Sequence, residues 1–230
     1  MPDPPPLSVV VPALDEAGVI AATLAPLQHW RERGAEVIVV DGGSSDGTPA
    51  LAAPLADRVL DGPRGRARQM NAGADAARGG ILVFVHADTR LPGQGDQLIR
   101  RALAGRPRWG RFDVHLDGAD RHPLLGLVGT LMNARSRLTG IATGDQSLFV
   151  TRAAFDAAGG FADQPLMEDI ALSRALKRAA GRPACLRERA LTASRRWEQG
   201  GITRTIARMW GLRLAYFLGV PPARLARWYR

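Results

Sequence analysis

The sequence predicts an α/β fold with a mostly parallel central sheet that is flanked by helices. In the first half of the chain, short apolar runs rich in valine and isoleucine alternate with segments of helical character. Continuous apolar strands separated by helices are typical of a parallel sheet that is covered on both faces. The 230 residues, 46% of them hydrophobic, are enough to bury one large core.

The first half supplies four strands and three helices. The strands are expected at residues 7–11, 36–40, 58–60 and 81–85, and the helices at 17–33, 48–56 and 66–77. Pro26 should kink the first helix, because proline lacks the N–H that a helix interior needs. Ligands of parallel sheets bind beyond the carboxyl ends of the strands. The loops after the first, second and last of these strands are therefore the expected site.

The second half is less regular and predicts a smaller set of elements. We expect strands at 109–116 and 147–151, and helices at 124–138, 167–180 and 201–218. The predicted organisation is a flexible leader over 1–6, one domain over 7–200, and a C-terminal amphipathic helix with a basic tail over 201–230, packed on that domain. The leader lacks the features of a signal peptide, and Cys185, the single cysteine, excludes an internal disulfide. These features predict a cytoplasmic protein.

The net charge of +9 has two explanations. Lys177 is the only lysine, so the excess of arginine fits biased codon usage. The alternative is attraction to anionic partners such as phosphates, nucleic acid or a lipid surface. Charge alone does not separate these explanations.

The loop after the second strand reads DGGSSDGT over residues 41–48. The carboxylate of Asp41, at the end of a buried strand, can accept hydrogen bonds from a base or a ribose, and the glycines let the backbone approach a ligand closely. The alternative is an ordinary polar turn in which Asp46 or Thr48 caps the following helix. Taken alone, this loop favours the turn.

The loop after the last strand of the first half contains His86 and Asp88. A hard divalent cation needs carboxylate oxygen, and Mn²⁺ also accepts imidazole. Such a cation can neutralise a diphosphate leaving group. The alternative is a solvated strand end in which Asp88 caps the next turn.

Two acids, Glu168 and Asp169, begin the helix expected at 167–180. A carboxylate at the ligand edge of the sheet can deprotonate an acceptor hydroxyl. Acids also pair favourably with a helix N-terminus, which explains at least one of the two.

In order and spacing these motifs resemble the family 2 glycosyltransferases, which have the GT-A fold. The matching segments are residues 8–17 (SVVVPALDEA), 39–48 (VVDGGSSDGT), 65–73 (GRARQMNAG), 86–88 (HAD) and 159–174, which begins GGF. Within that family, residues 65–71 (GRARQMN), 140–146 (GIATGDQ) and 195–198 (RRWE) resemble a bacterial subgroup, the radical-SAM/selenodomain-associated transferases, also described as arsenosugar-biosynthesis glycosyltransferases.

The resemblance implies transfer of a sugar from a nucleotide-sugar donor, preferably a UDP-sugar, to an unidentified acceptor, with inversion. It implies a divalent cation, Mn²⁺ or Mg²⁺, held by Asp88, with His86 where the family has the first Asp of its DxD motif. Asp169 would be the general base, with Glu168 in reserve. The implied nucleotide-sugar-binding residues are Pro12, Leu14, Glu16, Asp41, Ser44, Arg66, Asn71, Asp88 and Arg196.

The helix expected at 201–218 has an apolar face opposite Arg204 and Arg208. A basic amphipathic helix with aromatic residues can lie on an anionic membrane, which would make the protein peripheral. Packing on the domain is the favoured alternative, because Arg213 interrupts the apolar face.

Two other functions are alternatives to sugar transfer. A nucleotidyltransferase would need a glycine-rich basic loop after the first strand, and residues 12–16 do not provide one. A non-catalytic binder of membranes or nucleic acid leaves Asp41, Asp88 and Asp169 unexplained, so no nucleic-acid partner is expected. No G-x-G-x-x-G follows a strand, which excludes a typical dinucleotide-binding oxidoreductase.

Overall fold

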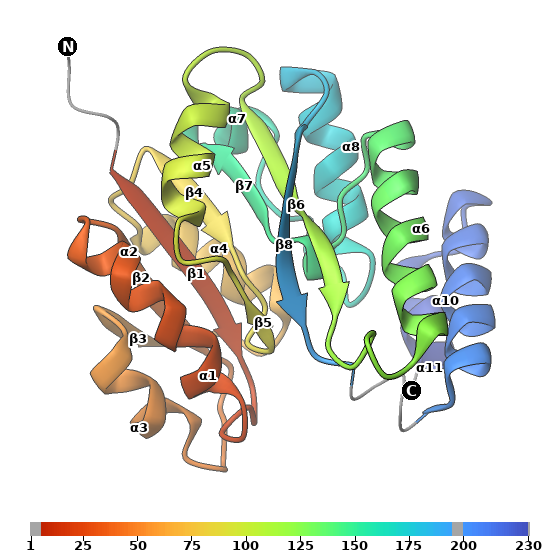
Figure 1. The fold of residues 1–230 in the computed structure, drawn as a ribbon, viewed down its shortest axis with the longest axis horizontal. Helices are drawn as coiled ribbons and strands as arrows, with labels where there is room; N and C mark the ends of the chain where they lie inside the picture. Colours follow the sequence, from red (N-terminus) through yellow and green to blue (C-terminus); the bar gives the residue numbers. More distant parts are fainter. Residues whose placement is uncertain (1–5, 195–199, 230) are drawn as a thin grey trace.

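The computed structural model describes residues 6–194 and 200–229. Its centre is an eight-stranded sheet with the order β3-β2-β1-β4-β7-β6-β8-β5 (Figure 1). The strands are β1 (Leu7–Ala13), β2 (Glu36–Asp41), β3 (Arg58–Asp61), β4 (Ile81–Phe84), β5 (Thr89–Arg90), β6 (Trp109–Leu116), β7 (Leu148–Thr151) and β8 (Ala184–Thr192). The leader expected at 1–6 falls, apart from Pro6, outside the described residues.

The sheet is mostly parallel, as the sequence predicts. Strands β1 to β4 run in one direction, and β6 pairs parallel with β8. Strand β7 is antiparallel to both of its neighbours, and the short β5 is antiparallel to β8. Because β7 alone lies reversed between β4 and β6, the carboxyl ends of all strands except β7 and β5 meet at one edge.

Helices cover both faces of this sheet. Leu7, Val9 and Val11 pack toward one face, under α1 (Ile20–Leu24), α2 (Gln28–Glu32), α3 (Thr48–Ala52) and α5 (Gly95–Leu103). Val10 packs toward the other, under α4 (Arg66–Ala76), α7 (Arg152–Ala157) and α8 (Glu168–Ala180). A strand buried on both sides must be apolar at every position, which explains the continuous apolar runs.

Prolines shorten two expected helices. The helix expected at 17–33 begins at Ile20 and is divided by a 3₁₀ turn, η1 (Ala25–Leu27), that contains Pro26. The helix expected at 48–56 similarly ends in a second 3₁₀ turn, η2 (Ala53–Leu55). Both breaks follow from the missing proline N–H.

The C-terminal segment forms two helices beside α6 (Pro123–Thr139), at the right of Figure 1. They are α10 (Ile202–Phe217) and α11 (Pro222–Tyr229), where the sequence predicts one helix and a tail. Leu212 and Leu225 are buried in a cluster with Met167 and Ile170 of the α8 region. In the described part of the chain, no helix is both long and apolar enough to cross a bilayer.

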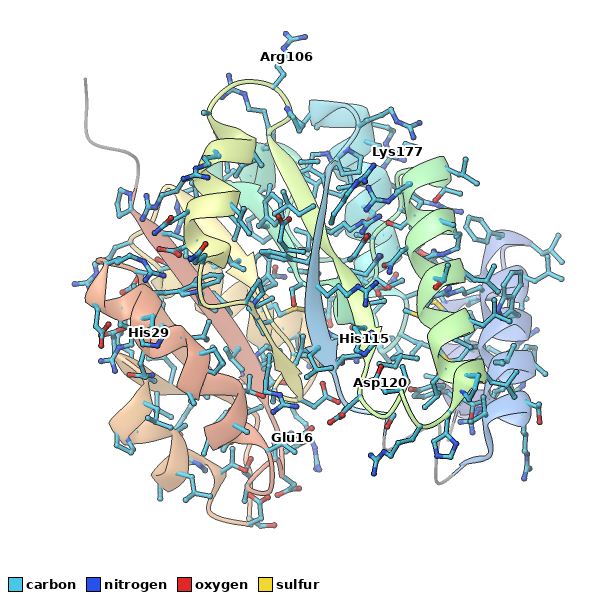
Figure 2. All side chains as sticks on the ribbon, viewed as in Figure 1. Glu16, His29, Arg106, His115, Asp120 and Lys177 are labelled. Atoms are coloured by element: carbon cyan, nitrogen blue, oxygen red, sulfur yellow. The ribbon has the colours of Figure 1, made fainter. Side chains whose placement is uncertain are left out.

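The carboxyl edge of the sheet lies at the bottom of both views. Figure 2 places Glu16, in the loop after β1, at this edge, and Arg106 and Lys177 at the opposite one. The loops that carry the predicted motifs therefore gather at one end of the molecule.

Candidate active site

The loops after β1 and β2 are joined by four hydrogen bonds between backbone and side chains. The backbone N–H groups of Asp15, Glu16 and Ala17 donate to Ser44 Oγ, Thr48 Oγ1 and Asp46 Oδ2, respectively, at 2.8–2.9 Å. In return, the Ser45 N–H donates to Asp15 Oδ1 at 2.8 Å. The polar residues of the second loop thus hold the first loop in place, since each supplies an acceptor for an N–H that no strand satisfies.

Asp41 lies at the end of β2 and is 4% exposed. Its Oδ2 accepts hydrogen bonds from the N–H groups of Gly43 and Ser44, each at 2.9 Å, and Ser44 Oγ also donates to Oδ1. Asp46 accepts from the Thr48 N–H at 3.0 Å, as the polar-turn alternative requires. Neither Asp41 nor Ser44 belongs to the wall of the adjacent cavity, so their contact with a nucleotide stays a prediction.

Gln69 of α4 is a buried link that the sequence analysis missed. Its Nε2 donates to the carbonyls of Ala13 and Val40, at 2.7 and 2.8 Å, and thereby joins the ends of β1 and β2. Its side chain also lines the cavity at this edge of the sheet. It lies inside the motif at 65–73, but only the structure shows that its amide faces the two strand ends.

A cavity of about 340 Å³ opens at the carboxyl edge of the sheet, and we call it the donor cavity. Most of the predicted nucleotide-sugar residues line it, together with both predicted metal ligands: Pro12, Leu14, Glu16, Arg66, His86 and Asp88. The structure adds Gln69, Asp145, Thr192 and Met209 to the wall. Residues from loops far apart in sequence thus converge on one concave, polar and apolar surface.

Asp88 and His86 lie in the donor cavity as the predicted ligands of a divalent cation. His86 Nδ1 is 3.7 Å from Asp145 Oδ1, a second carboxylate on the same wall. In residues 6–194 and 200–229, no three His, Cys, Asp or Glu side chains are close enough to hold a metal together. A cation here would therefore need oxygen ligands from a bound diphosphate, the usual arrangement for Mg²⁺ in phosphate sites.

A second cavity of about 50 Å³ adjoins the first, and we call it the acceptor cavity. Four residues line both: Arg66, His86, Asp145 and Met209. Asp169 lines only the acceptor cavity. Its Oδ2 accepts a hydrogen bond from the Gly144 N–H at 2.8 Å, and its Oδ1 from the Ile170 N–H at 2.7 Å. Two backbone donors thus fix the orientation of this carboxylate.

Gly144 brings η3 (Gly144–Gln146) against the His86 ring. A Cβ atom at this position would overlap the ring, so only glycine permits the contact. The contact sets His86, from the donor-side loop, directly against the backbone that holds Asp169. It therefore couples the positions of the two predicted functional groups.

Glu168 has a different environment from its neighbour. It is 3% exposed and lines neither cavity, and its Oε1 is 2.9 Å from Arg66 Nε. Burial raises the pKa of the Glu168 carboxyl, against the opposing effect of Arg66. Glu168 therefore orients the Arg66 side chain, while Asp169 is the acid that reaches the acceptor cavity.

One further predicted residue, Asn71, lines neither cavity. Asn71 donates through Nδ2 to the Phe161 carbonyl at 2.8 Å and accepts from the Phe161 N–H at 2.9 Å. These bonds occupy its amide in joining α4 to the segment before α8. Arg196 lies outside the described residues.

The chain is similar in sequence to a known protein family and to two bacterial proteins. Residues 8–150 match the family model described as "Glycosyl transferase family 2". A PGL/p-HBAD biosynthesis glycosyltransferase of Mycobacterium bovis (strain BCG / Pasteur 1173P2) is 36% identical over 105 residues, which cover 43% of this chain and 41% of that protein. The succinoglycan biosynthesis protein ExoO of Rhizobium meliloti (strain 1021) is 39% identical over 106 residues, 44% of this chain and 30% of that protein. The chain thus spans well under half the length of these relatives.

Solved structures share the fold. The mannosyltransferase PcManGT from Pyrobaculum calidifontis, in complex with GDP-Man and Mn²⁺, has a TM-score of 0.65 at 24% identity, over 94% of this chain and 63% of that chain. Glucosyl-3-phosphoglycerate synthase from Mycobacterium tuberculosis, in complex with Mn²⁺, UDP and glucosyl-3-phosphoglycerate, also has a TM-score of 0.65, at 19% identity, over 94% and 81%. Likeness at this level confirms the predicted GT-A fold.

Proposed function

The chain belongs to glycosyl transferase family 2, and on this premise we propose that it transfers a sugar from a nucleoside-diphosphate donor, preferably a UDP-sugar, to an acceptor hydroxyl. The observation that carries the proposal is the shared wall of the donor and acceptor cavities, with Asp88 in the first and Asp169 in the second. A donor and an acceptor bound in adjoining cavities are held in position to react, which removes much of the entropic cost of their meeting.

The proposed reaction is a single displacement with inversion. The acceptor oxygen forms a bond to the anomeric carbon, while the bond from that carbon to the diphosphate oxygen breaks. The acceptor proton passes to Asp169, and the electron pair of the broken bond leaves with the nucleoside diphosphate. The backbone donors on Asp169 hold its carboxylate in place for this proton.

The proposal assigns the diphosphate to Arg66, Asp88 and a divalent cation, Mn²⁺ or Mg²⁺. Arg66 lines both cavities and is oriented by Glu168, so its guanidinium can follow the diphosphate as it leaves. Asp88 would hold the cation, with His86 as a candidate second ligand. When bound, the cation supplies charge neutralisation of the leaving group. The structural relatives solved with Mn²⁺ and a nucleotide support this part of the proposal.

Ligand binding and donor hydrolysis test the proposed function. Thermal shift is measured with UDP, GDP and NAD, each with and without Mn²⁺, and hydrolysis is then screened over a panel of nucleotide-sugars. Stabilisation by one nucleoside diphosphate that depends on the cation, and hydrolysis of its sugar conjugate, are expected. Stabilisation by NAD alone, or by no nucleotide, would overturn the proposal.

Two finer assignments remain part of the proposal. Membership in the radical-SAM/selenodomain-associated subgroup rests on the segments at 65–71 and 140–146, and is a hint about the acceptor through its arsenosugar label. Peripheral contact with an anionic membrane rests on Trp210 and Phe217 of α10, which are 61% and 54% exposed, with Arg204 and Arg208 on the same helix.

Liposome sedimentation tests the membrane contact. The double variant Trp210→Ser with Phe217→Ser should bind anionic vesicles more weakly than the wild type, and high salt should weaken binding by the wild type as well. Equal sedimentation of both proteins, or none, would remove the membrane from the proposed function.

A further inference from the structure

A groove of about 130 Å³ lies between α6 and α10, next to the acceptor cavity. Its walls are mainly apolar: Leu124, Leu127 and Leu131 come from α6, and Ile206, Met209 and Trp210 from α10. The two helices lie side by side at the right of Figure 1. No part of the proposed mechanism uses this groove.

The apolar walls of the groove are open to solvent. Leu124, Leu127 and Leu131 are 48%, 53% and 48% exposed, and Trp210 is 61% exposed. The three leucines follow helical spacing on α6, and so form one continuous stripe. A contiguous exposed apolar patch of this kind marks an interaction or ligand-binding site, whereas apolar side chains that are exposed singly need no such explanation. The stripe continues to one charged residue, Arg135.

Arg135 is the unusual member of the groove wall. Its Nε and Nη2 atoms are buried and have no hydrogen-bond partner among the residues that the structure describes. Burial, and then the neighbouring charge of Arg213, lower the pKa of Arg135 to about 10. Asp169 opposes this effect, but in residues 6–194 and 200–229 no group accepts a hydrogen bond from Nε or Nη2. The nearby Arg111, by contrast, is fully buried, and its guanidinium donates to Ser136 Oγ and to the carbonyls of Phe112 and Asn133. Buried donors without a partner are costly, so these two atoms of Arg135 favour an anionic ligand.

The groove is continuous with the acceptor cavity. Asp145, Met209 and Arg213 line both. A molecule in the groove therefore has its inner end beside Arg213 and Arg135, and from there it can reach the cavity that contains Asp169. At this inner end the two guanidinium groups of Arg135 and Arg213 outnumber the one carboxylate of the groove wall, Asp145, which favours an anionic group, whereas the outer part of the groove suits a hydrocarbon chain.

We propose that the acceptor is an anionic lipid, with its hydrocarbon chain between α6 and α10, its phosphate at Arg135 and Arg213, and its head-group hydroxyl at Asp169. This inference rests on the proposed function, because it names the acceptor of that reaction. The apolar walls of the groove match the hydrocarbon chain of the lipid. The guanidinium of Arg135 matches its phosphate, and the residues shared by the groove and the acceptor cavity give the head group a path to Asp169.

Calorimetry with small ligands tests the groove on the full chain, without any donor. The probe is dihexanoyl phosphatidylglycerol below its micelle concentration. Glycerol phosphate, which lacks the chain, and hexyl glucoside, which lacks the anion, are the matched controls. Each control should bind at least about tenfold more weakly, because a charged hydrogen bond or a buried chain is lost. Equal binding of all three ligands would overturn the proposal.

Substitutions in the groove should show which residues hold the phosphatidylglycerol. Arg135→Gln should weaken phosphatidylglycerol binding about tenfold and leave hexyl glucoside binding unchanged, and Arg213→Gln provides an independent second test. The exposed Arg101→Gln on α5 is the control. Leu131→Asp should abolish binding, whereas Leu51→Asp, at a leucine that is 45% exposed on α3, should not.

Two readouts separate ligand binding from a structural role. The melting temperature of Arg135→Gln should not fall below that of the wild type, because the replaced donors have no partner. A clear fall would show that Arg135 is structural and would overturn the assignment. A dimer in solution that Leu131→Asp dissociates would show that a second copy of this chain covers the groove, and would also overturn it.

The test distinguishes this inference from the proposed function. If phosphatidylglycerol binds as described but no nucleotide binds, the transferase proposal fails and the lipid site stands. If nucleotide and donor hydrolysis behave as proposed but the lipid does not bind, the groove assignment fails alone.

Discussion

The donor side and the acceptor side of the cavity system differ in how fully their polar groups are paired. On the donor side, the loops after β1 and β2 are joined through Ser44, Asp46 and Thr48, and Gln69 joins the strand ends beneath them. On the acceptor side, the pairing is incomplete. Within the described ranges 6–194 and 200–229, every buried side-chain polar atom without a partner lies between residues 135 and 168.

Apolar exposure follows the same division. Of the large apolar side chains that are exposed in the described chain, all except Leu51 lie at or beyond residue 124. A preformed donor pocket needs no ligand to satisfy its backbone, since the protein supplies each partner. An acceptor side with unpaired donors and open apolar walls is complete only when a ligand contacts it. The difference supports a proposed donor site that is largely preformed and a proposed acceptor that completes part of its own site.

Replacing the proposed general base, Asp169, should have the largest effect on the rate of sugar transfer. Asp169→Asn keeps the shape of the side chain and its capacity to accept from Gly144, but removes its basicity. Transfer should fall by about 10²–10⁴-fold, the usual contribution of a positioned base. Nucleotide affinity and melting temperature should stay near those of the wild type. The exposed Asp163→Asn, in the segment before the same helix, is the control, and a variant at 169 that keeps most of its transfer rate would remove the assignment.

Removing the carboxylate at Asp88 should act on the donor side alone. Asp88→Ala should lower UDP affinity in Mn²⁺ by about 10–100-fold, the scale on which lost support of a metal site acts. In EDTA the variant and the wild type should bind UDP equally. If the wild type itself binds UDP equally well with Mn²⁺ and with EDTA, the donor side works without a cation.

Matched substitutions of buried polar residues compare the two sides directly. Gln69→Leu removes the buried side-chain hydrogen bonds to the carbonyls of Ala13 and Val40, of which Ala13 keeps the Gly42 N–H as a donor, and should lower the free energy of unfolding by roughly 1–3 kcal/mol. Arg135→Met removes a charge that has no partner at Nε and Nη2, and should leave the free energy of unfolding unchanged or raise it. Urea unfolding measures both, and equal losses in the two variants would contradict the division drawn above.

Two acids of the β2 loop separate nucleotide contact from scaffolding. Asp41→Ala should weaken nucleotide binding about fivefold, with or without metal, if one hydrogen bond to the ligand is lost. Asp46→Ala removes the bonds to Thr48 and Ala17 but no assigned ligand contact. If both variants lose affinity equally, Asp41 is part of the scaffold only.

The pH dependence of stability should show the smallest effect, with opposite signs for two buried acids, Glu36 at the start of β2, away from the cavities, and Glu168 at the start of α8. Although burial alone raises the pKa of Glu36, hydrogen bonds from the Arg78 N–H and the Ser8 hydroxyl lower it below its ordinary value of 4.5. Its contribution is therefore present above pH 4.5 and is lost as the pH falls through the folded-state pKa. Burial raises the pKa of Glu168 above 4.5, so its contribution is present below that pH and is lost as the pH rises.

Glutamine variants test these signs by urea unfolding across pH. Glu36→Gln should flatten the loss of stability on the acid side, and Glu168→Gln the loss above pH 4.5. Each slope is at most about 1.4 kcal/mol per pH unit, because one group binds one proton. If both variants changed the slope of the unfolding free energy against pH with the same sign, the two acids would have similar environments.

Much of the donor side could be predicted from the sequence, because it is built from short motifs at strand ends. The runs at 7–11 and 36–40 are apolar enough to identify β1 and β2, and their following loops carry the expected acids. Pro12, Leu14 and Glu16 line the donor cavity as predicted. Period and residue type are local properties, so they are visible without knowledge of the tertiary contacts.

Three other features, on both sides of the cavity system, could not be predicted in the same way. Strand β8 carries a run of charged residues and pairs with β6 through a register shift after Phe112, so it lacks the pattern of a buried strand. Arg135 is one arginine among many in this chain, and its burial follows only from the approach of α10. Gln69 was missed for the same reason, because its two partners are backbone carbonyls of distant strands.

The position of Met209 has a consequence for how such an enzyme can diversify. Met209 lines the donor cavity, the acceptor cavity and the groove. It belongs to α10, which follows the last strand of the sheet in the chain. Substitutions at this turn of α10 can therefore alter which acceptor fits without changing a strand register or a loop that recognises the nucleotide. Met209 itself also touches the donor cavity, so selection on acceptor choice alone would act on its neighbours Ile206 and Trp210, which line only the groove. A library at those two positions should yield new acceptors at unchanged nucleotide preference, whereas one at Met209 should shift both.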